Sequence, residues 1–502
     1  MVANTPPVAP PANASAGSAL TDTTARTSRL RSWSIRAVFI ALLGACGFVM
    51  FAATAPSTVG YAALAMVLVL MFMRVPIAVS MAVPSLIGLY ALRGELAVES
   101  ALATVPFSAT AQWTLTVLPM FVFMGVLLEM SGITATIYRA ASAWLNWMPG
   151  GVGVATNVAG AGLSSISGSS LGTTYALGRA GIPEMLDRGY DRRLAVGAVG
   201  VSSLAGHLIP PSMMLVIYAG IAEVPIGPQL LAGVMPGLLI VACSCALIVL
   251  LGLLRPELVG SGKASRSVAR VTWRERWISL ARVWPVPVLV VVVLGGMLAG
   301  AFTATEAAAG GAVGAVLLTT LMRRKDKPLT VLRESAGKTV EAIGSIFLLV
   351  IGAVLMTRFL AITGITGAFT DWVADSGMSR TAFLLILVVV YVILGTFLES
   401  MTMMLLVVPF LIPTLHMLEV DMLWFGVFTV LLAEVGLLHP PLGILSYIIH
   451  GLAQDPRVNR GVRITLGDVF VSILWFIPAI AVTLALLMAF PEIVTWLPGL
   501  SE

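Results

Sequence analysis

The sequence predicts an all-α polytopic membrane protein built from two inverted-topology repeats, each with a broken helix and a re-entrant helical hairpin. Three observations predict it. The 502 residues are 58% hydrophobic and only 11% charged, which excludes an ordinary soluble domain. A proline and glycine pattern recurs at a fixed offset. The basic residues that flank the two copies lie at opposite ends, as expected for segments inserted upside down relative to each other.

The repeat is defined by small polar residues followed by proline motifs. Pro183, Gly206 and Pro210 recur as Pro413, Gly436 and Pro440, each 230 positions later. Each copy has an apolar segment interrupted by small polar residues, at 165–170 and at 395–402, and then an apolar segment with a Pro-Pro pair. The alternative is that apolar segments resemble each other by chance. Three pairs of residues separated by the same 230 positions argue against it. Paired, broken helices in two halves of a membrane protein indicate a transport site.

The elements follow in order. We expect a flexible cytoplasmic tail over 1–33 and an extra transmembrane helix over 34–55, which four preceding arginines mark as a retained span with a cytoplasmic amino end rather than a cleaved signal. The first repeat covers 56–254 and the second 285–490. A basic cytoplasmic linker, 255–284, joins them, and 491–502 form a periplasmic tail. The apolar stretch 286–322 lies between two basic loops, so it must cross twice, with the turn at 300–306.

The polar interruptions point to a cation site. Where a helix unwinds, carbonyls lose their partners, and nearby hydroxyls complete an oxygen cage for an ion such as Na⁺. Opposed helix amino ends favour an anionic substrate. The alternative is that small residues only allow tight helix packing. The candidate sodium-binding residues from this reasoning are Ser167, Gly168, Ser169, Ser170, Gly395, Thr396, Ser400 and Thr402. Two further small polar pairs, Thr114 with Thr116 and Gly344 with Ser345, lie at equivalent places in the two halves. They are either tips of re-entrant hairpins that face the breaks or parts of ordinary spans.

A second set of residues is expected to contact substrate. It consists of Ser169, Ser170, Glu399, Pro210, Pro211, Pro440 and Pro441. The Pro-Pro pairs break the helix ladder and form either a second unwound wall of the site or simple kinks. Glu399, Glu434 and Glu306 interrupt apolar segments, where carboxylates are usually functional. His207 and His439 precede the proline pairs, as proton carriers or as hydrogen-bonded packing residues.

Several classes of protein are disfavoured. The sequence lacks the G-x-x-x-x-G-K-[ST] loop, so ATP is not the evident energy source. Cys46, Cys243 and Cys245 lie in apolar runs and form no metal-ligand pattern or disulfide framework. No cofactor is expected apart from Na⁺ as the coupling ion. An intramembrane enzyme would need a reactive pair facing a nucleophile, and no convincing one is present. A channel remains a further alternative, which saturation of the flux would distinguish.

The motifs resemble the large membrane subunit of tripartite ATP-independent periplasmic (TRAP) transporters, the DctM-like family. The resemblance rests on the segments at 162–170, 182–191, 208–212, 302–309 and 424–438, in order over about residues 75–490. It departs from the family pattern at Ala304, where a proline is usual, and at His439, where a threonine is usual.

The resemblance implies an inner-membrane secondary transporter of bacteria that moves organic acids with Na⁺ by an elevator-like motion. It also implies two helical hairpins, with sodium sites at the hairpin tips and helix breaks, and this adds Thr114, Thr116, Gly344 and Ser345 to the candidate sodium-binding residues. It also implies two partners, a periplasmic solute-binding protein and a small four-helix membrane subunit. A stand-alone Na⁺- or H⁺-coupled dicarboxylate transporter of the same plan is the alternative. The chain is not expected to be an enzyme or to bind nucleic acid.

Overall fold

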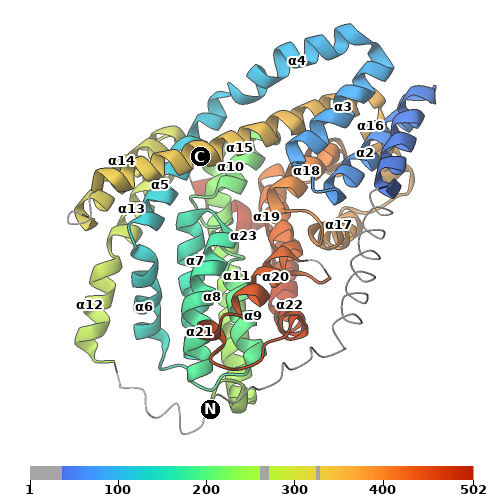
Figure 1. Cartoon of the computed structure of the whole chain (residues 1–502). Coiled ribbons are helices and arrows are strands. Elements are labelled where there is room, and N and C mark those ends of the chain that lie inside the picture. The colour runs from blue at the N-terminus through green and yellow to red at the C-terminus, as the bar shows by residue number, and fades with distance from the viewer. Residues whose placement is uncertain (1–36, 261–270, 324–327, 442, 501–502) are drawn as a thin grey trace, which may run out of the picture.

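The computed structural model describes residues 37–260, 271–323, 328–441 and 443–500 as an array of helices (Figure 1). The predicted tail 1–33 and the middle of the predicted linker, 261–270, lie outside these ranges. Within them, β pairing is limited to one isolated bridge between Tyr190 and Val259. The all-α prediction is therefore confirmed.

The first half of the chain begins with the helix that the sequence predicts as an extra span. The helices are Ala37–Ala52, α2 Pro56–Phe72, α3 Ile77–Arg93, α4 Glu95–Thr110, η1 Trp113–Thr116, α5 Val117–Met130, α6 Ile133–Leu145, α7 Gly151–Ser167, α8 Ser170–Asp187, α9 Arg192–Ser202, α10 Met213–Ile221 and α11 Ile226–Leu254. Two elements, η2 Pro256–Leu258 and α12 Trp273–Val283, follow within the linker.

The second half repeats much of this order. It contains α13 Pro285–Leu298, α14 Ala304–Met322, α15 Pro328–Thr363, α16 Ile365–Asp375, α17 Arg380–Gly395, α18 Ser400–Met417, α19 Met422–Leu438, α20 Ile444–Leu452, α21 Pro456–Asn459, α22 Leu466–Ala489, α23 Glu492–Thr495 and η4 Pro498–Leu500. The predicted turn within 286–322 falls between α13 and α14, where Thr303 and Glu306 form a capping box that starts α14.

Several helices are long and apolar enough to cross a bilayer. In the described part of the chain six pass a test of length and hydropathy, and the bent pair of Trp273–Val283 with Pro287–Leu298 would make a seventh. The six are Trp113–Met130, Ile226–Leu254, Ala304–Met322, Pro328–Thr363, Ser400–Met417 and Leu466–Ala489. The polytopic membrane class is confirmed by these spans.

The first interrupted segment is a helical hairpin and not a helix that breaks and continues. At 1.5 Å per residue, a straight course would separate Thr156 and Gly181 by about 37 Å. Instead, a Cβ at Gly181 would lie 3.1 Å from Oγ1 of Thr156. Helices α7 and α8 therefore run antiparallel, and they lie side by side in Figure 1. We call this pair hairpin 1, and its tip is Gly168-Ser169.

The second interrupted segment also folds back. Arg380 at the start of α17 donates a hydrogen bond to the carbonyl of Glu419, just beyond the end of α18, at 3.4 Å. A straight course through these residues would span about 58 Å. Helices α17 and α18 therefore form hairpin 2, with residues 396–399 at its tip. The sequence predicts broken helices at both of these places, and the fold corrects that assignment.

The predicted hairpin tips lie elsewhere. Gly344 and Ser345 are exposed residues inside α15, which continues unbroken from Pro328 to Thr363. The Ser345 hydroxyl donates to the Glu341 carbonyl of its own helix at 3.0 Å, a bond that is compatible with a continuous helix. Thr114 and Thr116 lie in η1. The helix before it, α4, and the helix after it, α5, both pack on α15 but make little contact with each other, so they do not pair as a hairpin.

The interrupted helices are those that carry the Pro-Pro pairs. Residues 203–212, with the cis pair Pro210-Pro211, separate α9 from α10, and the cis pair Pro440-Pro441 lies between α19 and α20. Proline cannot donate a backbone hydrogen bond, so each pair ends the helical ladder. Pro210 and Pro211 are buried, Pro440 is half-buried and Pro441 is exposed. The described part of the chain thus has two hairpins, whose tips lie where the sequence predicts broken helices, and two helix interruptions at the Pro-Pro pairs.

Candidate functional site

The tip of hairpin 1 follows from three consecutive small residues. Gly168 ends α7 in the left-handed conformation, with φ of 59°, which glycine adopts without strain. Ser169 then caps α8, because its Oγ accepts a hydrogen bond from the amide of Gly172 at 3.1 Å. Ser167 closes the turn from the other side, with its Oγ 3.3 Å from the amide of Ser169. The Ser-Gly-Ser-Ser sequence therefore encodes a two-residue turn between helices.

The tip of hairpin 2 is held against α19 by glycine. A Cβ at Gly395 would lie 2.4 Å from Cα of Gly436, so the two backbones touch where α17 ends. Residues 396–399 then leave the helix, and α18 begins at Ser400. Thr402 in the first turn of α18 donates to Oε2 of Glu399 at 3.4 Å. Glu399 is half-buried at this tip.

The unwound segment between α9 and α10 carries His207 to the tip of hairpin 1. Its Nε2 lies 2.9 Å from the carbonyl oxygen of Gly168, and a carbonyl only accepts, so this nitrogen carries the proton. Ser212, which caps α10 through the amide of Leu215, donates to the His207 carbonyl. The middle and the carboxyl end of this unwound segment are thus held by side-chain to backbone bonds.

Glu434 on α19 is the point where both hairpins meet. Ser170, the first residue of α8, donates to its Oε2 at 2.5 Å, and Ser400, the first residue of α18, donates to its Oε1 at 2.8 Å. Nδ1 of His207 lies 2.9 Å from Oε1 and donates to it when both ring nitrogens carry a proton. Glu434 is fully buried, at 0% exposure. A buried carboxylate needs such donors, because an unpaired charge in an apolar interior is costly.

The amino ends of two helices and one imidazole favour negative charge at this place. The carboxylate faces the amino ends of α8 and α18, where helix dipoles are positive, and it contacts the imidazole of His207. A second carboxylate, Glu399, lies within electrostatic range of both Glu434 and His207. In the described residues no three His, Cys, Asp or Glu side chains form a group that could hold a metal ion.

The fold brings together part of the predicted site. Gly168, Ser169 and Ser170 lie at one tip and Ser400 at the other, joined through Glu434. Thr396, at the start of the tip of hairpin 2, donates to the Ile393 carbonyl, and Gly395 contacts α19. Neither Thr114 nor Thr116 makes a hydrogen bond to a tip: Thr116 donates to Trp113 within η1. Gly344 and Ser345 are on the exposed face of α15.

Two central residues were not among the predicted site residues. The sequence marks Glu434 as a carboxylate in an apolar segment and His207 as a histidine before a proline pair, and it assigns neither of them to the site. A charged residue in a run of otherwise apolar residues was the available signal for Glu434. For Glu306 the same signal misleads, because its carboxylate caps α14 through Thr303 at 2.8 Å. Nothing in the sequence places His207 beside Glu434.

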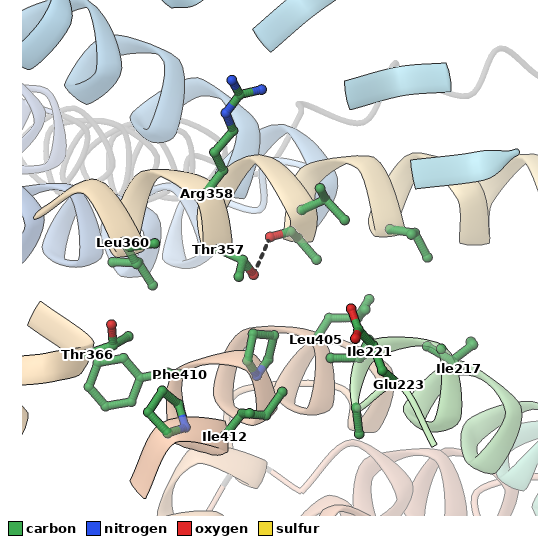
Figure 2. Close-up of a pocket in the computed structure, with 18 of the residues that line it drawn as sticks. Ile217, Ile221, Glu223, Thr357, Arg358, Leu360, Thr366, Leu405, Phe410 and Ile412 are labelled. Atoms are coloured by element: carbon green, nitrogen blue, oxygen red, sulfur yellow. Dashed lines mark hydrogen bonds between the residues drawn. The ribbon is translucent and has the colours of Figure 1, made fainter. Parts of the chain in front are cut away.

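A cavity of about 620 Å³ lies between α15 and the helices α10 and α18 (Figure 2). Its lining is mainly apolar and includes Ile217, Ile221, Leu405 and Phe410. Thr357 satisfies its hydroxyl on the Ala353 carbonyl of its own helix, and Figure 2 shows Arg358 pointing away from the space below α15. On α18 the lining starts at Leu405, five residues after Ser400. The cavity therefore lies along α18, the second helix of hairpin 2, and not at the tips.

The chain matches a family model described as "Tripartite ATP-independent periplasmic transporter, DctM component" over residues 64–493. It is 31% identical to the C4-dicarboxylate TRAP transporter large permease protein DctM of Pseudomonas aeruginosa, over 76% of this chain and 88% of that protein. It is 30% identical to the sialic acid TRAP transporter large permease protein SiaM of Vibrio cholerae, over 77% and 87%.

The fold is also similar to a solved membrane transporter. The YdaH transporter of Alcanivorax borkumensis superposes with a TM-score of 0.57 over 81% of this chain and 89% of that one, at 14% identity. At that identity the likeness concerns the fold alone. The family match covers most of the sequence, and the resemblance inferred from the motifs is confirmed. The chain belongs to the DctM family of large permease components of tripartite ATP-independent periplasmic transporters.

Proposed function

We propose that this large permease subunit imports an organic acid across the bacterial inner membrane, coupled to Na⁺, with its amino end in the cytoplasm. The observation that carries the proposal is the meeting of both hairpin tips at the buried carboxylate of Glu434. Substrate would bind beside the tips, near Ser169, Ser170 and Glu399, with the proline breaks as its walls. The C4-dicarboxylate and sialic acid relatives support a carboxylate as cargo.

The charges around the tips support cation coupling. An anionic substrate at this place would approach two carboxylates, Glu399 and Glu434, with the basic His207 beside them. Repulsion between like charges is large where water is excluded. A cation that binds first would offset this repulsion, so the substrate would enter only after Na⁺. The serine, threonine and carbonyl oxygens of the two tips are the ligand types that a hard cation prefers.

The cavity along α18 supports an elevator-like motion. It separates part of α15 from α10 and α18, and its lining is mainly apolar. An apolar seam with few polar bonds across it allows two helical bodies to slide. The hairpins with α9, α10, α19 and α20 would then move together, and α15 with α3, α4 and α5 would stay fixed. The partners would be a periplasmic solute-binding protein and a small four-helix membrane subunit.

Reconstitution tests the proposal. The chain, its small subunit and its binding protein are placed in liposomes, and uptake of a labelled dicarboxylate or sialic acid is followed with an inward Na⁺ gradient. We expect uptake that stops when K⁺ replaces Na⁺ and when the binding protein is omitted. Uptake that persists without Na⁺ would exclude sodium coupling. Uptake by this chain alone would instead identify a stand-alone anion transporter.

A further inference from the structure

Glu434 is the one carboxylate in the described part of the chain that receives a hydroxyl from each hairpin. Each hairpin donates to a different oxygen: Ser170 of hairpin 1 to Oε2 and Ser400 of hairpin 2 to Oε1. Both serines are at least 98% buried, and both are the first residue of the returning helix. The two oxygens belong to one planar group, so a rotation that moves one of them also moves the other, and this links the positions of the two tips.

Helix α19, which carries Glu434, is anchored to both hairpins at the same level. Two residues after Glu434, Gly436 touches the backbone of Gly395 at the end of α17. On the other side, His207 joins Oε1 of Glu434 to the Gly168 carbonyl at the tip of hairpin 1. Neither tip can leave α19 without withdrawing a donor from the same buried charge. The bonds that remain must then satisfy a carboxylate that has lost part of its solvation.

We propose that Glu434 is a positioning residue that makes the two hairpin tips a single gate, so that release of one tip loosens the other. This deepens the proposed function, since it assumes that the tips bound the transport site. The physical reason is that a carboxylate with one donor withdrawn reorients toward water or toward the remaining donors. Reorientation of a rigid planar group shifts both of its oxygens, and with them the hydrogen bond to the second tip.

Accessibility of the tips tests this directly. Leu171, next to Ser170, is 36% exposed, and Phe397, at the tip of hairpin 2, is 45% exposed, so a cysteine at either position reports on its own hairpin. The three native cysteines are first replaced by alanine. Each reporter is then combined with Ser170→Ala or Ser400→Ala, and the rate of alkylation by a polar maleimide is measured on the full chain in detergent.

We expect a cross effect. Ser170→Ala should raise alkylation not only at the Leu171→Cys reporter but also at Phe397→Cys on the other hairpin, and Ser400→Ala should do the reverse. Loss of one hydrogen bond to a charged group corresponds to a roughly tenfold larger open population. Glu434→Ala should open both tips, and Glu434→Gln should restore much of the protection, because an amide has the same shape and can bond to both hydroxyls.

A matched control comes from hairpin 1 itself. The Ser165 hydroxyl is buried and bonds within its own helix to the Gly162 carbonyl at 3.0 Å, so Ser165→Ala removes a hydroxyl without touching Glu434. It should leave the Phe397→Cys reporter unchanged. If each serine variant alters only the reporter on its own hairpin, or alters neither, the two tips are independent and the proposal is overturned.

The experiment separates this inference from the proposed function. Alkylation is measured without substrate and with choline in place of Na⁺, so a cross effect there stands even if transport proves independent of Na⁺. Size-exclusion profiles and melting temperatures identify any variant that fails to fold. If Ser170→Ala is such a variant, Ser400→Ala with the Leu171→Cys reporter supplies the same comparison from the other hairpin.

Discussion

The backbones of Gly395 and Gly436 cross in direct contact, so that a Cβ on Gly395 would lie 2.4 Å from Cα of Gly436. This crossing positions the tip of hairpin 2, because Ser400 follows five residues later and reaches Glu434, which is two residues before Gly436. The contact has a direct consequence for any side chain introduced there, since a backbone atom cannot move aside as the end of a side chain can.

Gly395→Ala should therefore destabilise the protein by about 1–3 kcal/mol, the usual cost of overpacking a tight contact. Thermal unfolding in detergent measures this. Gly367 in α16 is the matched control, because nothing lies within 4 Å of a Cβ placed there. Gly367→Ala should be neutral or stabilising by about 0.5–1 kcal/mol, as for an open helical site. Equal effects of the two variants would contradict the crossing.

Gly206 should also be intolerant of a side chain, because another residue lies too close to it, and a second substitution at that neighbour should relieve part of the clash. A Cβ there would lie 1.7 Å from Cβ of Ser164 on α7, where the unwound segment packs on hairpin 1. Gly206→Ala should lower the melting temperature and reduce uptake. The double variant Gly206→Ala with Ser164→Gly removes the two closest atoms, Cβ and Oγ of Ser164, and leaves its Cα 2.8 Å away, so it should recover part of the loss. If the second change adds to the damage instead, the two residues do not face each other as described.

Asp468 should be important for the start of α22 and for its contact with α9. It is 4% exposed, caps the helix through Thr465, and its Oδ1 lies 3.1 Å from Nε of both Arg192 and Arg193. Asp468→Ala should cost about 2 kcal/mol, from loss of the cap and of a screened ion pair, while Asp468→Asn keeps an oxygen for the cap and should cost about half of that.

Denaturation midpoints separate these two variants of Asp468. Arg457, on the surface near α21, pairs with Asp455 while 87% exposed, and Arg457→Ala should leave the midpoint unchanged. A similar loss in Asp468→Ala and Asp468→Asn would assign the whole effect to charge rather than to capping.

The Na⁺ dependence of uptake should distinguish residues at the hairpin tips, such as Ser400, from predicted site residues that lie elsewhere, such as Ser345. If the tips bind Na⁺ as proposed, Ser400→Leu fills the tip and should abolish uptake or raise the half-saturating Na⁺ concentration by roughly tenfold or more, in line with loss of a hydrogen bond to a charged group. Ser345→Ala on the exposed face of α15 should leave that concentration unchanged. A shift in Ser345→Ala comparable to that in Ser400→Leu would contradict the assignment.

The sequence predicted the class, the family and the places where the helices are interrupted. Composition and hydropathy determine membrane spans because the bilayer requires about 20 apolar residues per crossing. Gly168 and Ser169 encode a helix end and a new helix start through purely local chemistry, and the turn is found there. The proline pairs end helices for an equally local reason, the missing donor.

Hydropathy could not distinguish a broken helix from a hairpin. Both consist of two apolar helices around a short polar turn, and they differ only in whether the second helix continues or returns. That choice is made by packing, such as Thr156 against Gly181 in hairpin 1. The placement of Gly344 and Ser345 failed for the same reason: small residues are compatible with an exposed face of a continuous helix such as α15.

By itself, therefore, the sequence determined the helices, their ends and the polar tips, because each depends on the properties of neighbouring residues. Only the tertiary structure decided that Ser170, His207 and Ser400, spread over 231 positions, converge on Glu434. A buried carboxylate requires donors but does not specify them in the sequence, because the residues that solvate it are chosen by how the helices fold back and pack.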